Sequence, residues 1–253
     1  MERMLGSITA IINAYKRPEY LQEQITAIST QTKPPKEIWI WINVDVTTKF
    51  PTLAAHPNIP VSVIRSTKNF KYHGRFALAL LAQTDYVAIY DDDTIPGPEW
   101  HDNCLFGDER HPGSIFGGAG CILNSKQYAN HERVGWPSKN YTYTMVDLVG
   151  HAWFFQRETL NYMWRETPLT LENGEDIQFS YLAQKYGNVM TICPPHRADN
   201  FRGWSSLKAE LYGNDDKASS NGSLKSIPQF YQERDMCIQH CINGGWKTVR
   251  NIR

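Results

Sequence analysis

The sequence predicts an α/β fold, with a mostly parallel central sheet and helices on both faces. Two observations predict it. Short β-branched apolar runs alternate with segments of near-helical apolar spacing through the first 90 residues. Polar, chemistry-bearing residues follow directly after two of those runs. Strands that alternate with helices form parallel βαβ units, and ligands gather at the carboxyl ends of such strands.

The N-terminal half contains four expected strands, at residues 8–12, 37–42, 61–64 and 86–90. A helix is expected to begin at Pro18, because proline suits the first helical turn and apolar residues recur after it. A second helix is expected over residues 76–81. The order strand, helix, strand, loop, strand, helix, strand favours a sheet covered on both sides.

The C-terminal half is less regular. Strands are expected within residues 113–123, 146–155 and 188–193. Asn173 is a plausible N-cap for a helix that runs to about residue 186. Residues 213–225 are rich in Gly, Asn and Ser and predict a mobile loop, and a last helix should begin near Ser226. We therefore expect one domain, with a nucleotide-binding half (1–95) and an acceptor-binding half (96–253) that holds this loop and helix.

Composition excludes several classes of protein. The 253 residues include 26 basic and 26 acidic side chains, so no global charge favours nucleic acid or an anionic membrane. The five cysteines are scattered, which is not typical of a disulfide framework. The chain has no basic leader with a long apolar segment and no run of about 18 apolar residues, which favours a cytoplasmic protein without a membrane span.

Three consecutive aspartates, Asp91 to Asp93, follow the fourth expected strand. Side chains alternate along an extended chain, so Asp91 and Asp93 should point to one side and Asp92 to the other. Two carboxylates on one side suit Mg²⁺ or Mn²⁺, and the cation would offset their repulsion. Pro96 and Gly97 also fit a solvated turn. The spacing alone leaves these two interpretations open.

The first strand is followed by NAYKRP, residues 13–18, which brings one aromatic and two basic side chains to the same sheet edge. A ring can stack on a base and the cations can bind phosphate. The segment is also compatible with a helix start that exposes two basic residues. By itself it does not decide between the two.

Four blocks in order carry a resemblance to a known family. They read ITAIINAYKRPEYL, KNFKYHGRFALALLAQTDYVAIYDDDTIPGPEW, VDLVGHAWFFQRETL and NGEDIQFSYLAQKYG. Over residues 7–196 this order resembles GT-A glycosyltransferases, both the family 2-like enzymes and the exostosin-like ones. It is also similar to small viral glycosyltransferases. The resemblance implies a Rossmann-like GT-A fold and a DDD variant of the DxD motif.

The resemblance also implies roles for the donor side of the site. Tyr15, Arg17 and Arg75 match positions at the nucleotide. Asp91 would approach the ribose or a metal-bound water, and Asp93 would bind the metal directly. Asp92 would support the loop or lie near the sugar.

On the acceptor side, the resemblance implies a sugar and acceptor pocket formed by Gly150, His151 and Trp153. His196 falls where some members place a further metal ligand. The Glu175–Asp176 pair matches the acidic pair of the family, with Asp176 the first candidate for the catalytic base and Glu175 the second. Helix-start stabilisation alone could also account for two acids in a first turn.

The implied function is transfer of a hexose from a nucleotide diphosphate sugar to a glycan hydroxyl, with Mn²⁺ or Mg²⁺. A UDP-sugar is favoured as donor, and a GDP-sugar is the alternative. Two other functions fit less well. A non-catalytic nucleotide-sugar-binding module would keep the donor pocket. A nucleotide-sugar pyrophosphorylase would need a Gly-rich loop after the first strand, where this chain has NAYKRPEY.

Overall fold

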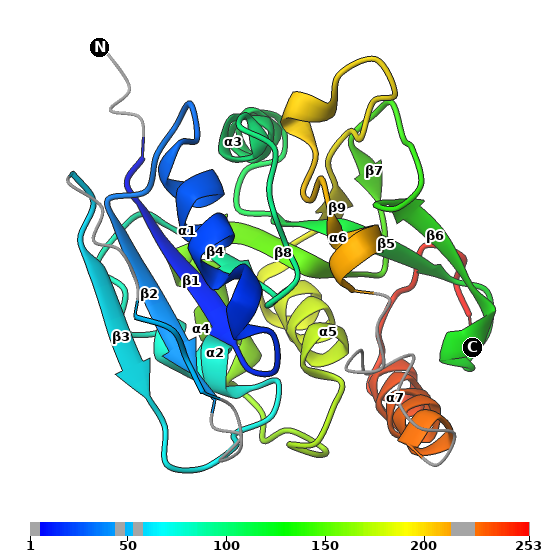
Figure 1. The fold of residues 1–253 in the computed structure, drawn as a ribbon. Helices are drawn as coiled ribbons and strands as arrows, with labels where there is room; N and C mark the ends of the chain where they lie inside the picture. The colour runs from blue at the N-terminus through cyan, green and yellow to red at the C-terminus, as the bar shows by residue number, and fades with distance from the viewer. Residues whose placement is uncertain (1–5, 44–48, 53–57, 214–225, 253) are drawn as a thin grey trace.

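The computed structural model describes residues 6–43, 49–52, 58–213 and 226–252. It confirms the α/β fold class (Figure 1). Within those ranges a nine-stranded sheet forms the centre, in the order β3-β2-β1-β4-β8-β5-β9-β7, with β6 paired to β5. The four strands of the N-terminal half are parallel to one another. β8 then runs antiparallel to both β4 and β5.

The strands are β1 (Ile8–Ala14), β2 (Glu37–Ile42), β3 (Val61–Arg65), β4 (Tyr86–Tyr90), β5 (Ile115–Leu123), β6 (His131–Gly135), β7 (Thr144–Met145), β8 (Leu148–Gln156) and β9 (Thr191–Cys193). The α-helices are α1 (Leu21–Ser29), α2 (Gly74–Ala79), α3 (Trp100–Arg110), α4 (Leu160–Met163), α5 (Glu175–Gly187), α6 (Ala209–Tyr212) and α7 (Ser226–Asn243). Short 3₁₀ helices are η1 (Pro18–Tyr20), η2 (Tyr128–Asn130), η3 (Arg157–Thr159) and η4 (Phe201–Gly203).

Both faces of the sheet are buried, and side-chain alternation divides the core in two. On one face, Ala88 and Tyr90 of β4 belong to a cluster with α1 and α3. On the other, Val87 and Ile89 pack with α2, α4 and α5. This double burial explains why the central strands are continuous apolar runs rather than alternating ones.

The antiparallel pairing of β4 and β8 brings the end of β4 to the middle of β8. Tyr90 is paired with Ala152. The backbone N–H of Asp91 donates to the carbonyl of His151 at 3.3 Å, and the hydroxyl of Thr94 donates to the same oxygen at 3.0 Å. His151 has a positive φ of 80°, a strained conformation for a non-glycine residue. The aspartate run and His151 are therefore neighbours in space.

Helix α5 begins one residue later than expected. The N-cap is Gly174, with φ 79°, and not Asn173. A left-handed conformation favours glycine, which explains the exchange. The side-chain oxygen of Asn173 instead accepts from the N–H of Gly174 at 2.7 Å. A Cβ atom on Gly174 would lie 2.5 Å from the sulfur of Cys237, so α7 packs closely against the start of α5.

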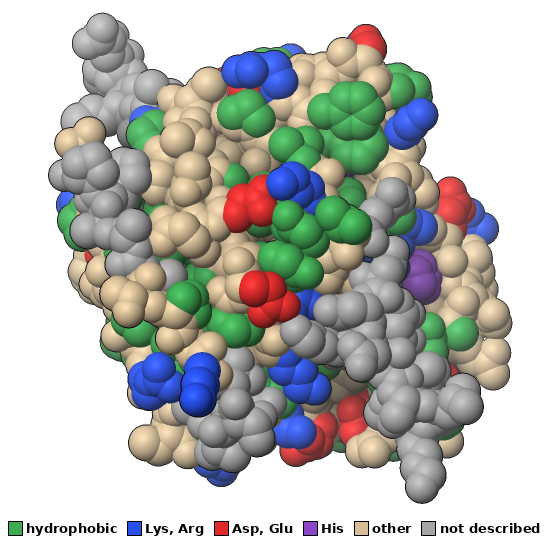
Figure 2. Space-filling model, in the orientation of Figure 1, with side chains coloured by type: hydrophobic (Ala, Val, Ile, Leu, Met, Phe, Trp, Pro, Cys, Tyr) green, Lys and Arg blue, Asp and Glu red, His purple; other side chains and the backbone are tan. Residues whose placement is uncertain are grey.

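The sheet is continuous across the expected boundary between residues 95 and 96. The division into a nucleotide-binding and an acceptor-binding half therefore stays a prediction. Most of the expected mobile loop, residues 214–225, lies outside the described residues. None of the described helices combines the length and apolar character that crossing a membrane requires. On the face shown in Figure 2, acidic and basic side chains of the described residues are interspersed.

Candidate active site

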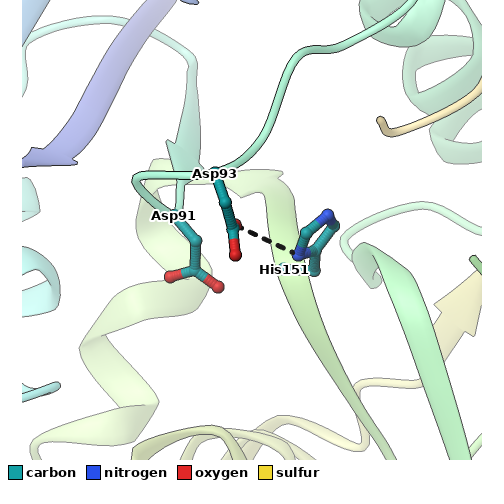
Figure 3. A group of neighbouring side chains, drawn as sticks. All are labelled: Asp91, Asp93 and His151. Carbon is teal, nitrogen blue, oxygen red and sulfur yellow. Dashed lines mark ion pairs between the residues drawn. The ribbon is translucent and has the colours of Figure 1, made fainter. Parts of the chain in front are cut away.

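Asp91, Asp93 and His151 form a group of potential metal ligands. One ligand atom from each lies within 4.8 Å of the other two. The imidazole Nδ1 of His151 is 3.8 Å from a carboxylate oxygen of Asp93. Figure 3 shows the two carboxylates side by side after β4, with the imidazole facing them from β8. Asp92 is not part of the group, as expected, although the run forms a turn after β4 and does not continue the strand.

Burial sets the charge states of this group. It raises the pKa of Asp93 to about 7, and repulsion from Asp91 and Asp92 adds to the effect. Burial lowers the pKa of His151 to about 4, so its imidazole is neutral at pH 7. A neutral imidazole has a lone pair to offer to a metal, and a carboxyl near its pKa releases a proton readily when a cation arrives.

Trp136 holds the imidazole from one side. Its ring stacks on His151 with centroids 4.3 Å apart and planes 9° apart. Trp136 follows β6 and His151 lies in the central strand β8, so no local sequence motif indicates the contact. A stacked ring restricts the rotation of His151 and keeps it directed at the aspartates.

Asp92 faces Arg17 of the first loop. The guanidinium lies 2.8 Å from Asp92 and 3.8 Å from Asp93, and its side chain is only 5% exposed. The backbone N–H of Lys16 also donates to Asp92, at 3.1 Å. Arg17 therefore offsets one of the negative charges of the aspartate turn. Tyr15 lies in the same loop, and its hydroxyl accepts from Asn69 at 3.0 Å.

Arg75 connects the aspartate turn to the acidic pair. It is fully buried, forms an ion pair with Asp91, and forms a second with Glu175 at 3.0 Å. Its guanidinium lies 4.4 Å from the ring centroid of Trp153. Trp153 was expected in the sugar pocket, but it is 2% exposed and packs beneath Arg75, so it offers no face to a ligand.

The acidic pair at the start of α5 is also buried. Burial, followed by repulsion from Asp176, raises the pKa of Glu175 to about 7. Asp176 forms an ion pair with Arg234 of α7 at 2.6 Å, and its other oxygen accepts from the N–H of Ile177 at 2.8 Å. The sequence patterns did not indicate Arg234, which lies 58 residues further along the chain.

The ion pairs leave an excess of negative charge. Five carboxylates and three guanidinium groups meet in this connected set, so two negative charges remain when every carboxyl is ionised. A single divalent cation would neutralise them. The acids are Asp91, Asp92, Asp93, Glu175 and Asp176, and the bases are Arg17, Arg75 and Arg234.

His196 does not join the metal group. It is fully buried, and both of its ring nitrogens have hydrogen-bond partners, the carbonyl of Pro194 at 2.9 Å and the hydroxyl of Ser205 at 2.8 Å. His196 was expected as a further metal ligand, but the histidine that lies beside Asp91 and Asp93 is His151. Gly150, expected at the sugar pocket, pairs with Ala119 in the sheet immediately before His151.

The fold is that of a glycosyltransferase of the GT-A type. Residues 9–198 match the model of glycosyl transferase family 2, so the chain belongs to that family. A search of the curated proteins found no match.

Two solved structures have a similar fold. The crystal structure of S. aureus TarS 1-349 is 15% identical, with a TM-score of 0.53, over 76% of this chain and 59% of that one. A second crystal structure of S. aureus TarS is 14% identical, with a TM-score of 0.54, over 94% of this chain and 43% of that one. The chain thus spans about half of the length of these structures. At such identities the likeness establishes the fold.

Proposed function

We propose that this chain transfers a hexose from a nucleotide diphosphate sugar to a glycan hydroxyl, with the help of a divalent cation. The observation that carries the proposal is the group formed by Asp91, Asp93 and His151 at the end of β4. It lies at the carboxyl edge of the parallel strands, where α/β folds bind nucleotides.

The residues fit a bound metal. Two carboxylates and one neutral imidazole are the potential ligands, and the connected set has an excess of two negative charges when every carboxyl is ionised. Carboxylates suit Mg²⁺ and Mn²⁺, whereas imidazole is less suited to Mg²⁺. The mixed donor set therefore favours Mn²⁺. When bound, the cation would supply electrostatic stabilisation of the leaving diphosphate.

The nucleotide is assigned to the first loop and the turn after β4. Tyr15 offers a ring beside the sheet edge, and Arg17 offers a cation that could move from Asp92 to a phosphate. Arg75 fixes Asp91, the proposed ribose contact, through their ion pair. We favour a UDP-sugar as donor, with a GDP-sugar as the alternative.

Asp176 is the proposed base for an inverting transfer. The acceptor oxygen bonds to the anomeric carbon, and the bond from that carbon to the diphosphate oxygen breaks. The nucleoside diphosphate leaves with the bonding electron pair, and the acceptor proton passes to the carboxylate of Asp176. Glu175 is the second candidate, and its side chain is 4% exposed against 8% for Asp176.

The test is release of nucleotide from a panel of UDP- and GDP-sugars, with Mn²⁺, with Mg²⁺ and with chelator. We expect Mn²⁺-dependent release from one donor class, and loss of at least about 100-fold in Asp93→Ala and His151→Ala. Asp199→Ala is the matched control, since Asp199 is exposed and pairs only with Arg197 among the described residues.

Two results would contradict the proposal. Donor binding without any nucleotide release, with a glycan acceptor present, would indicate a binding module. Near-normal transfer by Asp93→Ala in Mn²⁺ would exclude the metal assignment. NMR of the anomeric proton of the product tests inversion and therefore the role of Asp176.

A further inference from the structure

We propose that Arg234, in the C-terminal helix α7, is a positioning residue that orients the base Asp176. The inference rests on the proposed function. Helix α7 lies beyond residues 9–198, the range that matches the family. It packs beside α5 (Figure 1), and the contact brings a guanidinium to the acidic pair.

Arg234 contacts two neighbouring positions at the start of α5. One guanidinium nitrogen donates to a carboxylate oxygen of Asp176 at 2.6 Å, and another donates to the side-chain oxygen of Asn173 at 3.1 Å. The planar guanidinium has fixed donor directions, so two such contacts determine its orientation. The carboxylate it contacts is oriented in turn.

The rest of the arginine is held in a closed environment. The side chain is 5% exposed, and the ring centroid of Tyr128 lies 4.0 Å from the guanidinium carbon. Tyr128 is itself held by α7, because its backbone N–H donates to the side chain of Asp235 at 2.6 Å. Side chains of η2, α5 and α7 therefore enclose the guanidinium together.

The same contact organises the charges of the acidic pair. Glu175 and Asp176 are adjacent carboxylates, and each has its own arginine: Arg75 from α2 for Glu175 and Arg234 from α7 for Asp176. The other oxygen of Asp176 accepts from a backbone N–H at 2.8 Å. With both oxygens engaged, the carboxylate has one orientation, and a base must have the correct orientation toward the acceptor proton.

A purely structural role for Arg234 makes a different prediction, and a double-mutant cycle separates the two. The variants are Arg234→Ala, Asp176→Asn and the double variant, in the complete chain with Mn²⁺. We measure kcat, the acceptor KM, the Kd for the nucleoside diphosphate, and the thermal unfolding temperature. Arg250→Ala is the control, because Arg250 forms an exposed ion pair with Glu132.

If Arg234 acts through Asp176, Arg234→Ala lowers kcat by about 100-fold with little change in nucleotide Kd. The double variant is then no slower than Asp176→Asn, because the base is already absent. Arg234→Lys keeps the charge but only one of the two contacts, so it should recover about a tenth of the wild-type kcat. This conservative variant also serves if Arg234→Ala does not fold.

Two results overturn the inference. In the first, the fold-loss of kcat in the double variant equals the product of the two single losses. The same holds when Arg234→Lys replaces Arg234→Ala in the cycle. In the second, nucleotide affinity falls as much as kcat, which indicates a general disturbance of the fold. In both cases the wild type is active. Failure of the proposed function is recognised differently, by a wild-type chain that transfers no sugar from any donor.

Discussion

Replacing Glu175 by Gln should stabilise the protein at alkaline pH and leave its stability almost unchanged near pH 4.5. The side chain of Glu175 is 4% exposed, and burial raises its pKa from 4.5 to about 7. Between these values the folded protein keeps a proton that the unfolded chain has released. The free energy of unfolding of the wild type therefore falls as pH rises through this window.

The magnitude follows from the size of the shift. Each pKa unit corresponds to about 1.4 kcal/mol, so the raised pKa of Glu175 costs the wild type about 3 kcal/mol above pH 7. A glutamine has the shape of the protonated acid, can still accept the 3.0 Å hydrogen bond from Arg75, and does not titrate. The difference between variant and wild type should grow from near zero to about 3 kcal/mol.

Urea unfolding followed by tryptophan fluorescence, in chelator, between about pH 5 and about pH 8 measures this difference. Chelator is needed because a bound cation would change the charge balance. Glu172→Gln is the control: Glu172 is exposed and pairs with Lys71, so its effect should stay below about 1 kcal/mol at every pH. A difference that is independent of pH, or that shrinks as pH rises, would refute the reasoning.

Three further substitutions test the site. Gly174→Ala should lower the free energy of unfolding by at least about 1 kcal/mol, because alanine disfavours the positive φ at this position. It should also reduce transfer, because the new Cβ would meet Cys237 and push α7 away. Urea unfolding and kcat measure the two effects. His196→Gln should lower stability by about 1–3 kcal/mol while calorimetry finds Mn²⁺ affinity unchanged. Trp136→Ala should weaken Mn²⁺ binding about tenfold, with calorimetry again as the measure, because His151 loses the ring that holds it.

Much of the fold could be predicted because its signals are local. The apolar runs at β1, β2 and β4 lie at the residues where strands form. The strand expected over residues 37–42 has the same bounds as β2 in the structure. Asp92 is separated from the group of Asp91 and Asp93, as expected, although a turn closed by the Thr94 N–H and the Asp91 carbonyl, and not an extended strand, places the three side chains. Each of these depends on the backbone within a few residues.

The choice between the two histidines was different. His151 lies within β8 and His196 follows β9, and nothing in their neighbours along the chain distinguishes them as metal ligands. His151 reaches the aspartates because β8 runs antiparallel to β4, and because its φ of 80° departs from ordinary strand geometry. His196 instead satisfies both ring nitrogens in the core. Strand direction is a property of the assembled sheet.

By itself, then, the sequence determined the strands of the N-terminal half, the acidic turn after β4 and the acidic pair that begins α5, but it did not indicate α3, β6 or β7. The tertiary structure decided which charges meet. Arg17, Arg75 and Arg234 come from three distant parts of the chain, and each is buried against carboxylates of the site. A buried arginine is stable only next to its partner acid. That pairing depends on how the helices pack, which no local pattern encodes.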